Sequence, residues 1–102
     1  MPLFTVSCID KPDSFELRAA TRAAHLDWIA ASGARVKLGG PWLDGEGRSI
    51  GSLLIVEAED LAAAEAWAAQ DPYALAGLFR QVAVGAWRLV AGGFAEPATE
   101  AA

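Results

Sequence analysis

Apolar and polar residues alternate at the start of the chain. Phe4, Val6 and Cys8 are apolar, whereas the residues between them are polar. A period of two is typical of a β-strand with two unlike faces. The pattern predicts a first strand over residues 3–9, which Pro12 then separates from the next element.

The following segment changes to a helical period. Asp13 and Glu16 have the spacing of an acidic capping box, which predicts a helix with Asp13 as its N-cap. Apolar residues recur at steps of three, four and seven, so they share one helix face that we expect to be buried. That face consists of Phe15, Ala19, Leu26, Ala30 and Gly33, and Gly33 also serves as the C-terminal stop.

Residues 34–43 read as a second strand. Its glycines and Pro41 are typical of an edge position or a bulge. Residues 44–48 predict a hairpin turn. The third strand is expected over residues 49–57, and it includes an apolar run that indicates burial on both faces.

Asp60 precedes an alanine-rich helix expected over residues 61–70, with Leu61, Ala64 and Ala68 on its inner side. Asp71 and Pro72 stop that helix and suit the start of a short second one, Asp71 as N-cap and Pro72 at the first helical position. Residues 81–90 predict the fourth strand. The remainder, residues 92–102, is expected to be a flexible tail because it contains little that could be buried.

The element order is βαββαβ, which predicts one α+β domain of the ferredoxin-like class over residues 1–91. In this fold a four-stranded antiparallel sheet carries both helices on one face. The helices leave the second face uncovered, yet strands three and four place apolar residues on it, including Trp87 and Leu89. We therefore predict a homodimer in which two such faces meet.

Composition excludes several classes of protein. The net charge is −5 and the eight basic residues are scattered, which argues against nucleic-acid binding. Apolar residues form no stretch of about 18, so no membrane span is expected, and the N-terminus does not resemble a secretory signal. The expected location is the cytoplasm.

Cys8 and His25 are the only cysteine and histidine. A disulfide within the chain is therefore impossible, and we expect no metal site, because no pair of ligands has a recognisable metal spacing. The sequence also lacks a nucleophile elbow, a phosphate-binding glycine loop and a dinucleotide fingerprint. We therefore expect neither covalent catalysis nor a nucleotide cofactor, and we assign no cofactor.

Several short segments occur in order along this predicted frame: Asp10 to Pro12, Arg22 to Leu26, Gly40 with Pro41, Gly51 with Ser52, and, as the most specific, Trp67 to Phe79. Together these segments resemble the YciI-like family. The resemblance covers most of the chain, from Phe4 to Val90.

This resemblance implies a dimeric α/β barrel related to the fold of muconolactone isomerases. It also implies a suspected active site, because a histidine and an aspartate have been taken to suggest enzymatic function in this family. The histidine corresponds to His25.

Arg18, Arg22 and His25 follow one another at i, i+4 and i+7 of the first helix, on a flank of its apolar face. In a cleft, this polar stripe could bind an anionic or phenolic ligand. The alternative is that both arginines pair with surface carboxylates and that His25 packs at the edge of the core. The resemblance favours the first interpretation for His25.

Imidazole is a suitable general base, and a carboxylate on its second nitrogen would fix the tautomer. The two helices run parallel from the same edge of the sheet. From Asp13 to His25 is roughly 18 Å and from Asp60 to Asp71 roughly 16 Å, at about 1.5 Å per residue. Asp71 is therefore favoured as the partner. Asp10 lies at the start of the first helix and would have to act on the partner subunit or shape the turn.

Ser52 next to a glycine could offer a hydroxyl to a ligand, or it could be an ordinary strand serine. The leading hypothesis is a cofactor-independent enzyme that isomerises, or eliminates a group from, a small, cyclic, acidic metabolite. His25 would move the proton, Asp71 would orient it, and Arg22, Arg18 and Ser52 would bind the substrate. The alternative is a non-catalytic dimeric module that binds a small molecule or a protein through the same cleft.

Overall fold

The computed structural model describes residues 1–94 of the 102-residue chain. In chain order the elements are β1 (Leu3–Asp10), α1 (Phe15–Ala31), a 3-10 turn (Gly33–Arg35), β2 (Val36–Leu43), β3 (Ser49–Glu57), α2 (Leu61–Ala68), α3 (Pro72–Leu75) and β4 (Phe79–Trp87). The predicted tail, residues 92–102, lies mostly outside the described residues. None of the helices described is long and apolar enough to cross a membrane.

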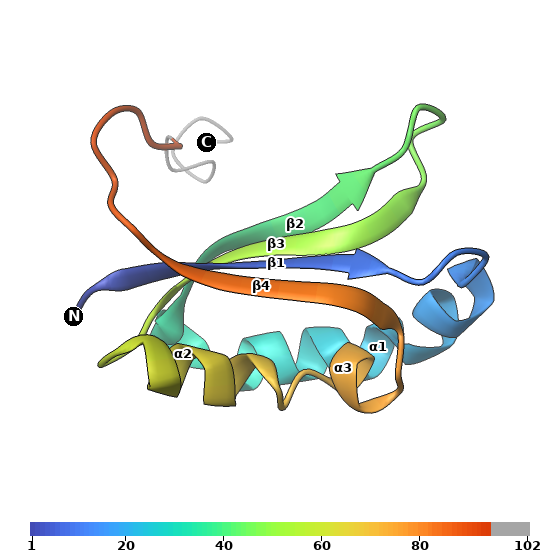
Figure 1. Cartoon of the computed structure of the whole chain (residues 1–102), viewed down its shortest axis with the longest axis horizontal. Helices are drawn as coiled ribbons and strands as arrows, with labels where there is room; N and C mark the ends of the chain where they lie inside the picture. Colours follow the sequence, from blue (N-terminus) through green and yellow to red (C-terminus); the bar gives the residue numbers. More distant parts are fainter. Residues whose placement is uncertain (95–102) are drawn as a thin grey trace, which may run out of the picture.

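The four strands form one antiparallel sheet in the order β2-β3-β1-β4. Figure 1 shows all the helices on the same side of this sheet. The predicted α+β ferredoxin-like fold is thus confirmed. The edge position predicted for β2 is also confirmed, and its pairing with β3 is irregular at both ends.

The core lies between the middle of the sheet and α2. Phe4, Val6 and Val56 point toward the helices and are at most 4% exposed. Ala64 and Ala68 of α2 pack against them, and Ala64 is fully buried. Small side chains on α2 bring the helix close to the larger side chains of the strands, which is how a protein interior reaches its usual packing density.

The start of α1 differs from the predicted capping box. Ser14 is the N-cap residue, and no side chain caps the first turn. Asp13 has a φ of 55°, in the left-handed region, whereas an N-cap residue has a non-helical, usually extended backbone. Asp13 therefore belongs to the turn after Pro12, and the prediction that it caps the helix was wrong.

The inner face of α1 also differs from the prediction. Its two buried residues are Arg18 and His25, whereas Phe15 is 38% and Leu26 44% exposed. Phe15, Ala19 and Leu26 of the predicted stripe line an open cavity instead of the core, and Ala30 and Gly33 are exposed. On α2, Leu61 was predicted to lie on the inner side together with Ala64 and Ala68. Ala64 and Ala68 are buried, but Leu61 is 44% exposed, so the prediction for Leu61 was wrong.

The bounds of strands β2 and β4 differ from those that the sequence pattern predicts. A 3-10 turn occupies Gly33–Arg35, so β2 begins at Val36. Strand β4 begins at Phe79, immediately after the glycine turn at Gly77, which has a φ of 77°. It ends at Trp87, so the predicted extension to residue 90 is wrong.

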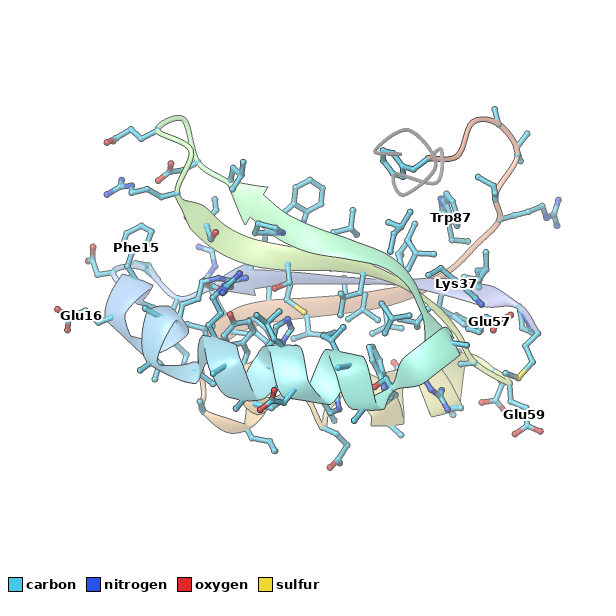
Figure 2. The ribbon with its side chains drawn as sticks, turned by 180° about the vertical axis from the view of Figure 1, so that it is seen from behind. Phe15, Glu16, Lys37, Glu57, Glu59 and Trp87 are labelled. Carbon is cyan, nitrogen blue, oxygen red and sulfur yellow. The ribbon has the colours of Figure 1, made fainter. Side chains whose placement is uncertain are left out.

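The second face of the sheet carries apolar side chains and no helix. Leu38 of β2 and Trp87 of β4 are 39% and 38% exposed, and the strand register places them on the same face as Thr5 and Ile55. Figure 2 shows Trp87 on the side of the sheet away from α1. An uncovered apolar sheet face of this kind is typical of an interaction surface.

Candidate active site

A cavity of about 390 Å³ lies between α1 and the β2-β3 half of the sheet. Volumes of this size accommodate small organic molecules. On the β2 side the cavity is lined by Gly39, Gly40 and Pro41, and on the α1 side its apolar lining includes Ala19 and Leu26. The polar lining comes from Arg18, Arg22, His25, Ser49, Ser52 and Tyr73.

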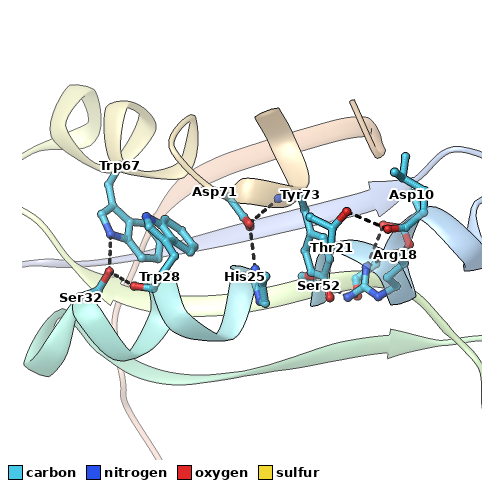
Figure 3. Close-up of polar contacts among 12 residues, drawn as sticks. Asp10, Arg18, Thr21, His25, Trp28, Ser32, Ser52, Trp67, Asp71 and Tyr73 are labelled. Atoms are coloured by element: carbon cyan, nitrogen blue, oxygen red, sulfur yellow. Dashed lines mark hydrogen bonds and ion pairs between the residues drawn. The ribbon is translucent and has the colours of Figure 1, made fainter. Parts of the chain in front are cut away.

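His25 and Asp71 are in direct contact at this cavity. His25 Nδ1 lies 2.8 Å from Asp71 Oδ1, and the two side chains are 10% and 3% exposed. Figure 3 shows the imidazole on α1 facing the carboxylate at the start of α3. Two elements that are far apart in sequence thus place an imidazole and a carboxylate within hydrogen-bonding distance.

The hydrogen bonds of Asp71 define the tautomer of His25. Asp71 Oδ1 also accepts the backbone N–H of Tyr73 at 2.9 Å, as the N-cap of α3. An ionised carboxylate can only accept hydrogen bonds, so Nδ1 must donate its proton to it. In the neutral imidazole, Nε2 then carries the lone pair. Nε2 has no hydrogen-bond partner among residues 1–94, and His25 lines the cavity.

Arg18 is held by a network of buried hydrogen bonds. Its Nη1 donates to both carboxylate oxygens of Asp10 at 3.0 Å, and its Nη2 donates to the Gly51 carbonyl at 2.7 Å and to Ser52 Oγ at 2.9 Å. Burial raises the pKa of Asp10, and the guanidinium of Arg18 lowers it in part. Within its own subunit Asp10 therefore neutralises Arg18, which lies seven residues, or about two helical turns, before His25 on α1.

The predicted substrate-binding residues divide into two groups. Arg18 and Ser52 line the cavity, but they bond to each other, and Ser52 is 3% exposed. Arg22 is exposed, lines the same cavity and makes no ion pair or side-chain hydrogen bond within the described part of the chain. Among these three residues, Arg22 is the one with a guanidinium available to a bound anion.

Gly51 explains how the network fits beneath the sheet. A Cβ at this position would collide with the backbone carbonyl of Cys8 on the neighbouring strand. The missing side chain lets the Gly51 carbonyl accept from Arg18 while β1 and β3 stay paired. Glycine is therefore required here for close approach of the backbone.

Tyr73 is the site residue that the sequence reasoning missed. Its ring stacks on the imidazole of His25, with centroids 4.2 Å apart. The guanidinium of Arg18, which is on α1, lies 4.5 Å from the centroid of the Tyr73 ring. The residue is 2% exposed and lines the cavity. The available signal was its position two residues after Asp71, at the start of the short helix whose N-cap contacts His25.

A second aromatic pair supports the imidazole from the other end of α1. Trp28 stacks on Trp67 with centroids 4.2 Å apart, and Trp28 also lies 5.9 Å from His25. Trp67 Nε1 donates to Ser32 Oγ at 3.0 Å. These contacts connect α1 to α2 and restrict the space in which His25 can move.

Cys8 lies in the core next to the site, and it provides a test of burial. Desolvation, followed by the charges of Asp71 and Asp10, raises the pKa of the Cys8 thiol from 9.0 to about 12. At pH 8 its thiolate fraction should therefore be about a thousandfold lower than that of an exposed thiol. We expect no alkylation of the folded protein by iodoacetamide over hours and complete alkylation in guanidinium chloride, measured by mass spectrometry. Rapid labelling of the folded protein would contradict this burial.

No group of three or more His, Cys, Asp or Glu side chains in the described residues could hold a metal ion. The cavity surface thus combines the groups that acid–base chemistry requires: an imidazole, a carboxylate bonded to its Nδ1, and the guanidinium of Arg22.

Comparison with known proteins adds the family context. The family model of the YCII-related domain matches residues 3–88. The protein YciI of Escherichia coli O6:H1 is 38% identical over 90 residues, which cover 80% of this chain and 92% of that protein. An antibiotic biosynthesis monooxygenase, 14% identical with a TM-score of 0.55, covers 89% of this chain and 100% of its own, and it shows similarity of fold alone.

A further solved structure is similar to this chain in sequence as well as in fold. It is the 5-chloro-2-hydroxyhydroquinone dehydrochlorinase TftG of Burkholderia phenoliruptrix AC1100, in complex with 2,5-dihydroxybenzoquinone. It is 33% identical to this chain, has a TM-score of 0.79, and the match covers 84% of this chain and 93% of TftG.

Proposed function

The chain belongs to the YCII-related family, and from this premise we propose that it is a cofactor-independent enzyme that moves a proton on a small, cyclic, acidic substrate. The observation that carries the proposal is the buried contact between His25 and Asp71 at the edge of a cavity. A dehydrochlorinase with a similar fold and sequence supports a catalytic role over simple binding.

In the proposed reaction, Nε2 of His25 is the general base. It takes a proton from the substrate, and Asp71 stabilises the imidazolium cation that forms. In an elimination, the electrons of the broken bond to hydrogen form a new double bond, and the leaving group departs with the electrons of its own bond. In an isomerisation, the imidazolium returns the proton to another atom of the same molecule. Neither reaction requires an oxidant or a cofactor.

Arg22 is proposed to hold the negative charge of the substrate. It lines the same cavity as His25, and its side chain is exposed. A guanidinium that is not already paired can form a charge-assisted hydrogen bond to a carboxylate or phenolate. Arg18 is proposed to act at shorter range, through the positive charge that it places above Tyr73 and beside Ser52.

We also propose that two copies of the chain form a dimer through the uncovered sheet face. Leu38 and Trp87 contribute exposed apolar surface to this face.

The dimer is tested by sedimentation velocity, which should give a particle of twice 10.7 kDa. Leu38→Asp should shift it toward the monomer, because a charge would be buried at the interface. Leu75→Asp, on the 71% exposed Leu75 of α3, is the matched control and should leave the dimer intact. A wild-type monomer at micromolar concentration would contradict the dimer.

The function is tested with the compounds of the related dehydrochlorinase. We expect the protein to bind 2,5-dihydroxybenzoquinone in calorimetry and to release chloride from 5-chloro-2-hydroxyhydroquinone faster than buffer does. Binding without chloride release, and without deuterium exchange into the ring in heavy water, would favour the non-catalytic module. A folded protein that neither binds nor turns over either compound would contradict the proposed substrate class.

A further inference from the structure

The ring of Tyr73 contacts both the imidazole of His25 and the guanidinium of Arg18. Its ring is stacked on the imidazole of His25 at an interplanar angle of 20°. The guanidinium of Arg18 lies 4.5 Å from its centroid. The backbone N–H of Tyr73 donates to the same Asp71 oxygen that holds His25. Tyr73 is therefore fixed relative to His25 by its ring and by its backbone.

The hydroxyl of Tyr73 has no partner inside the protein. None of residues 1–94 forms a hydrogen bond with it, although every buried side-chain nitrogen or oxygen in that part of the chain has a partner. The hydroxyl must therefore reach accessible space, and Tyr73 is one of the residues that line the cavity. A tyrosine that is 2% exposed and leaves its hydroxyl unbonded is unusual, because buried tyrosine hydroxyls commonly find a partner.

We propose that Tyr73 is a further catalytic residue, whose hydroxyl donates a hydrogen bond to an oxygen on the substrate ring while His25 Nε2 takes the proton. This inference rests on the proposed function and deepens it. The substrate must then carry a hydroxyl, enol or carbonyl oxygen next to the atom that loses the proton. The phenol proton stays on Tyr73 throughout, so the residue stabilises the negative charge that develops on that oxygen without accepting or losing a proton.

The surroundings of the phenol are suited to this role. Burial raises the pKa of Tyr73, and the positive charges of Arg18 and Arg22 oppose that rise only in part. Tyr73 is therefore a neutral donor at physiological pH. A donor in a partly dehydrated site stabilises a developing oxyanion more strongly than water does, because it is already oriented. A ring that lacks the oxygen would leave this donor unpaired on binding, which disfavours such ligands.

Tyr73 is the only tyrosine in the chain, so a single carbon-13 label on tyrosine Cζ reports on it alone. The experiment follows this signal by NMR through a pH titration, with and without saturating 2,5-dihydroxybenzoquinone. We expect the ligand to displace the signal and to move the ionisation of Tyr73 to higher pH, because the ligand oxyanion would stabilise the protonated phenol. An unchanged signal and an unchanged titration on binding would overturn the proposal.

Tyr73→Phe is the matched variant, since it keeps the stacked ring and removes only the hydroxyl. Its thermal unfolding should match the wild type, because the hydroxyl makes no bond within the described residues. We expect about a 10- to 100-fold lower kcat for chloride release, in the range of one lost oxyanion donor or somewhat below it. The affinity for benzoate, used as a probe that pairs with Arg22, should stay within about twofold.

The outcomes separate this inference from the proposed function. Chloride release by the wild type that is unchanged in Tyr73→Phe would overturn the role of Tyr73 and leave the enzyme intact. A wild type that shows the ligand-dependent tyrosine titration without turnover would support the donor role and contradict catalysis. A wild type that binds neither 2,5-dihydroxybenzoquinone nor benzoate would overturn the donor role.

Discussion

Replacing His25 with Asn should abolish most turnover while leaving the fold and the cavity in place. Asn removes the lone pair of Nε2, which is the proposed proton acceptor, and keeps a polar group that can donate to Asp71. General acid–base catalysis contributes about 10²- to 10⁴-fold, so we expect kcat for chloride release to fall by that factor. Affinity for 2,5-dihydroxybenzoquinone should change by less than about tenfold, because Arg22 still supplies the positive charge.

The measurement is the initial rate of chloride release at equal concentrations of folded protein, with circular dichroism to verify folding. Asp27→Asn is the matched control, because Asp27 lies on the exposed side of α1 and does not line the cavity. It should keep the wild-type rate. A His25→Asn protein that folds and retains the wild-type rate would contradict the role of the imidazole, and the cavity would then be better interpreted as a binding site.

The fold could be predicted from the sequence because local signals and hydrophobic periods agree for most elements. The alternation of residues 3–9 predicts the first strand, and the structure has it at Leu3–Asp10. The turn at residues 44–48 predicts where the third strand begins, and the structure has that strand at Ser49–Glu57. Asp71 and Pro72 also behave as expected, because Asp71 accepts the backbone N–H of Tyr73 at the start of α3. Such signals depend on neighbours in the sequence and can be read without the tertiary structure.

The inner face of α1 could not be predicted in the same way. Periodicity assigns the apolar stripe to the core, and in most helices this would be correct. Here the stripe containing Phe15 and Leu26 borders the cavity, whereas Arg18 and His25 are buried beside it. A polar residue can replace an apolar one inside only if a distant partner satisfies it, and no local pattern identifies that partner.

The contact between His25 and Asp71 could be predicted from the sequence, because positions along two parallel helices can be compared by the number of residues from each helix start. The network around Arg18 could not be predicted. Asp10 is eight residues from Arg18 and precedes a predicted turn, and no sequence pattern identifies the carbonyl of Gly51 as an acceptor. Tyr73 was missed for a related reason, since its ring acts by stacking on His25, and stacking geometry depends on how α1 and α3 pack.

The buried pair of Asp10 and Arg18 gives the largest expected effect on stability. The two side chains are 6% and 11% exposed, and two hydrogen bonds join them. Asp10→Ala would leave the Arg18 charge without a counter-ion inside the protein. Removing one partner of a buried ion pair costs about 3–5 kcal/mol of unfolding free energy, which is a large fraction of the stability of a small domain. We expect this loss in guanidinium chloride unfolding monitored by circular dichroism.

The double variant Asp10→Ala/Arg18→Met distinguishes a charge effect from a packing effect. If the cost comes from the unpaired guanidinium, removing the guanidinium should recover about half or more of the loss, since Met keeps most of the apolar volume. If the loss of unfolding free energy in the double variant instead equals the sum of the losses in the two single variants, each residue acts through its own packing. The distinction bears on function, because Arg18 can place a positive charge beside Tyr73 and Ser52 only while Asp10 compensates for burying it. Asp10 would then be a residue that never touches the substrate but makes the electrostatics of the cavity compatible with a stable fold.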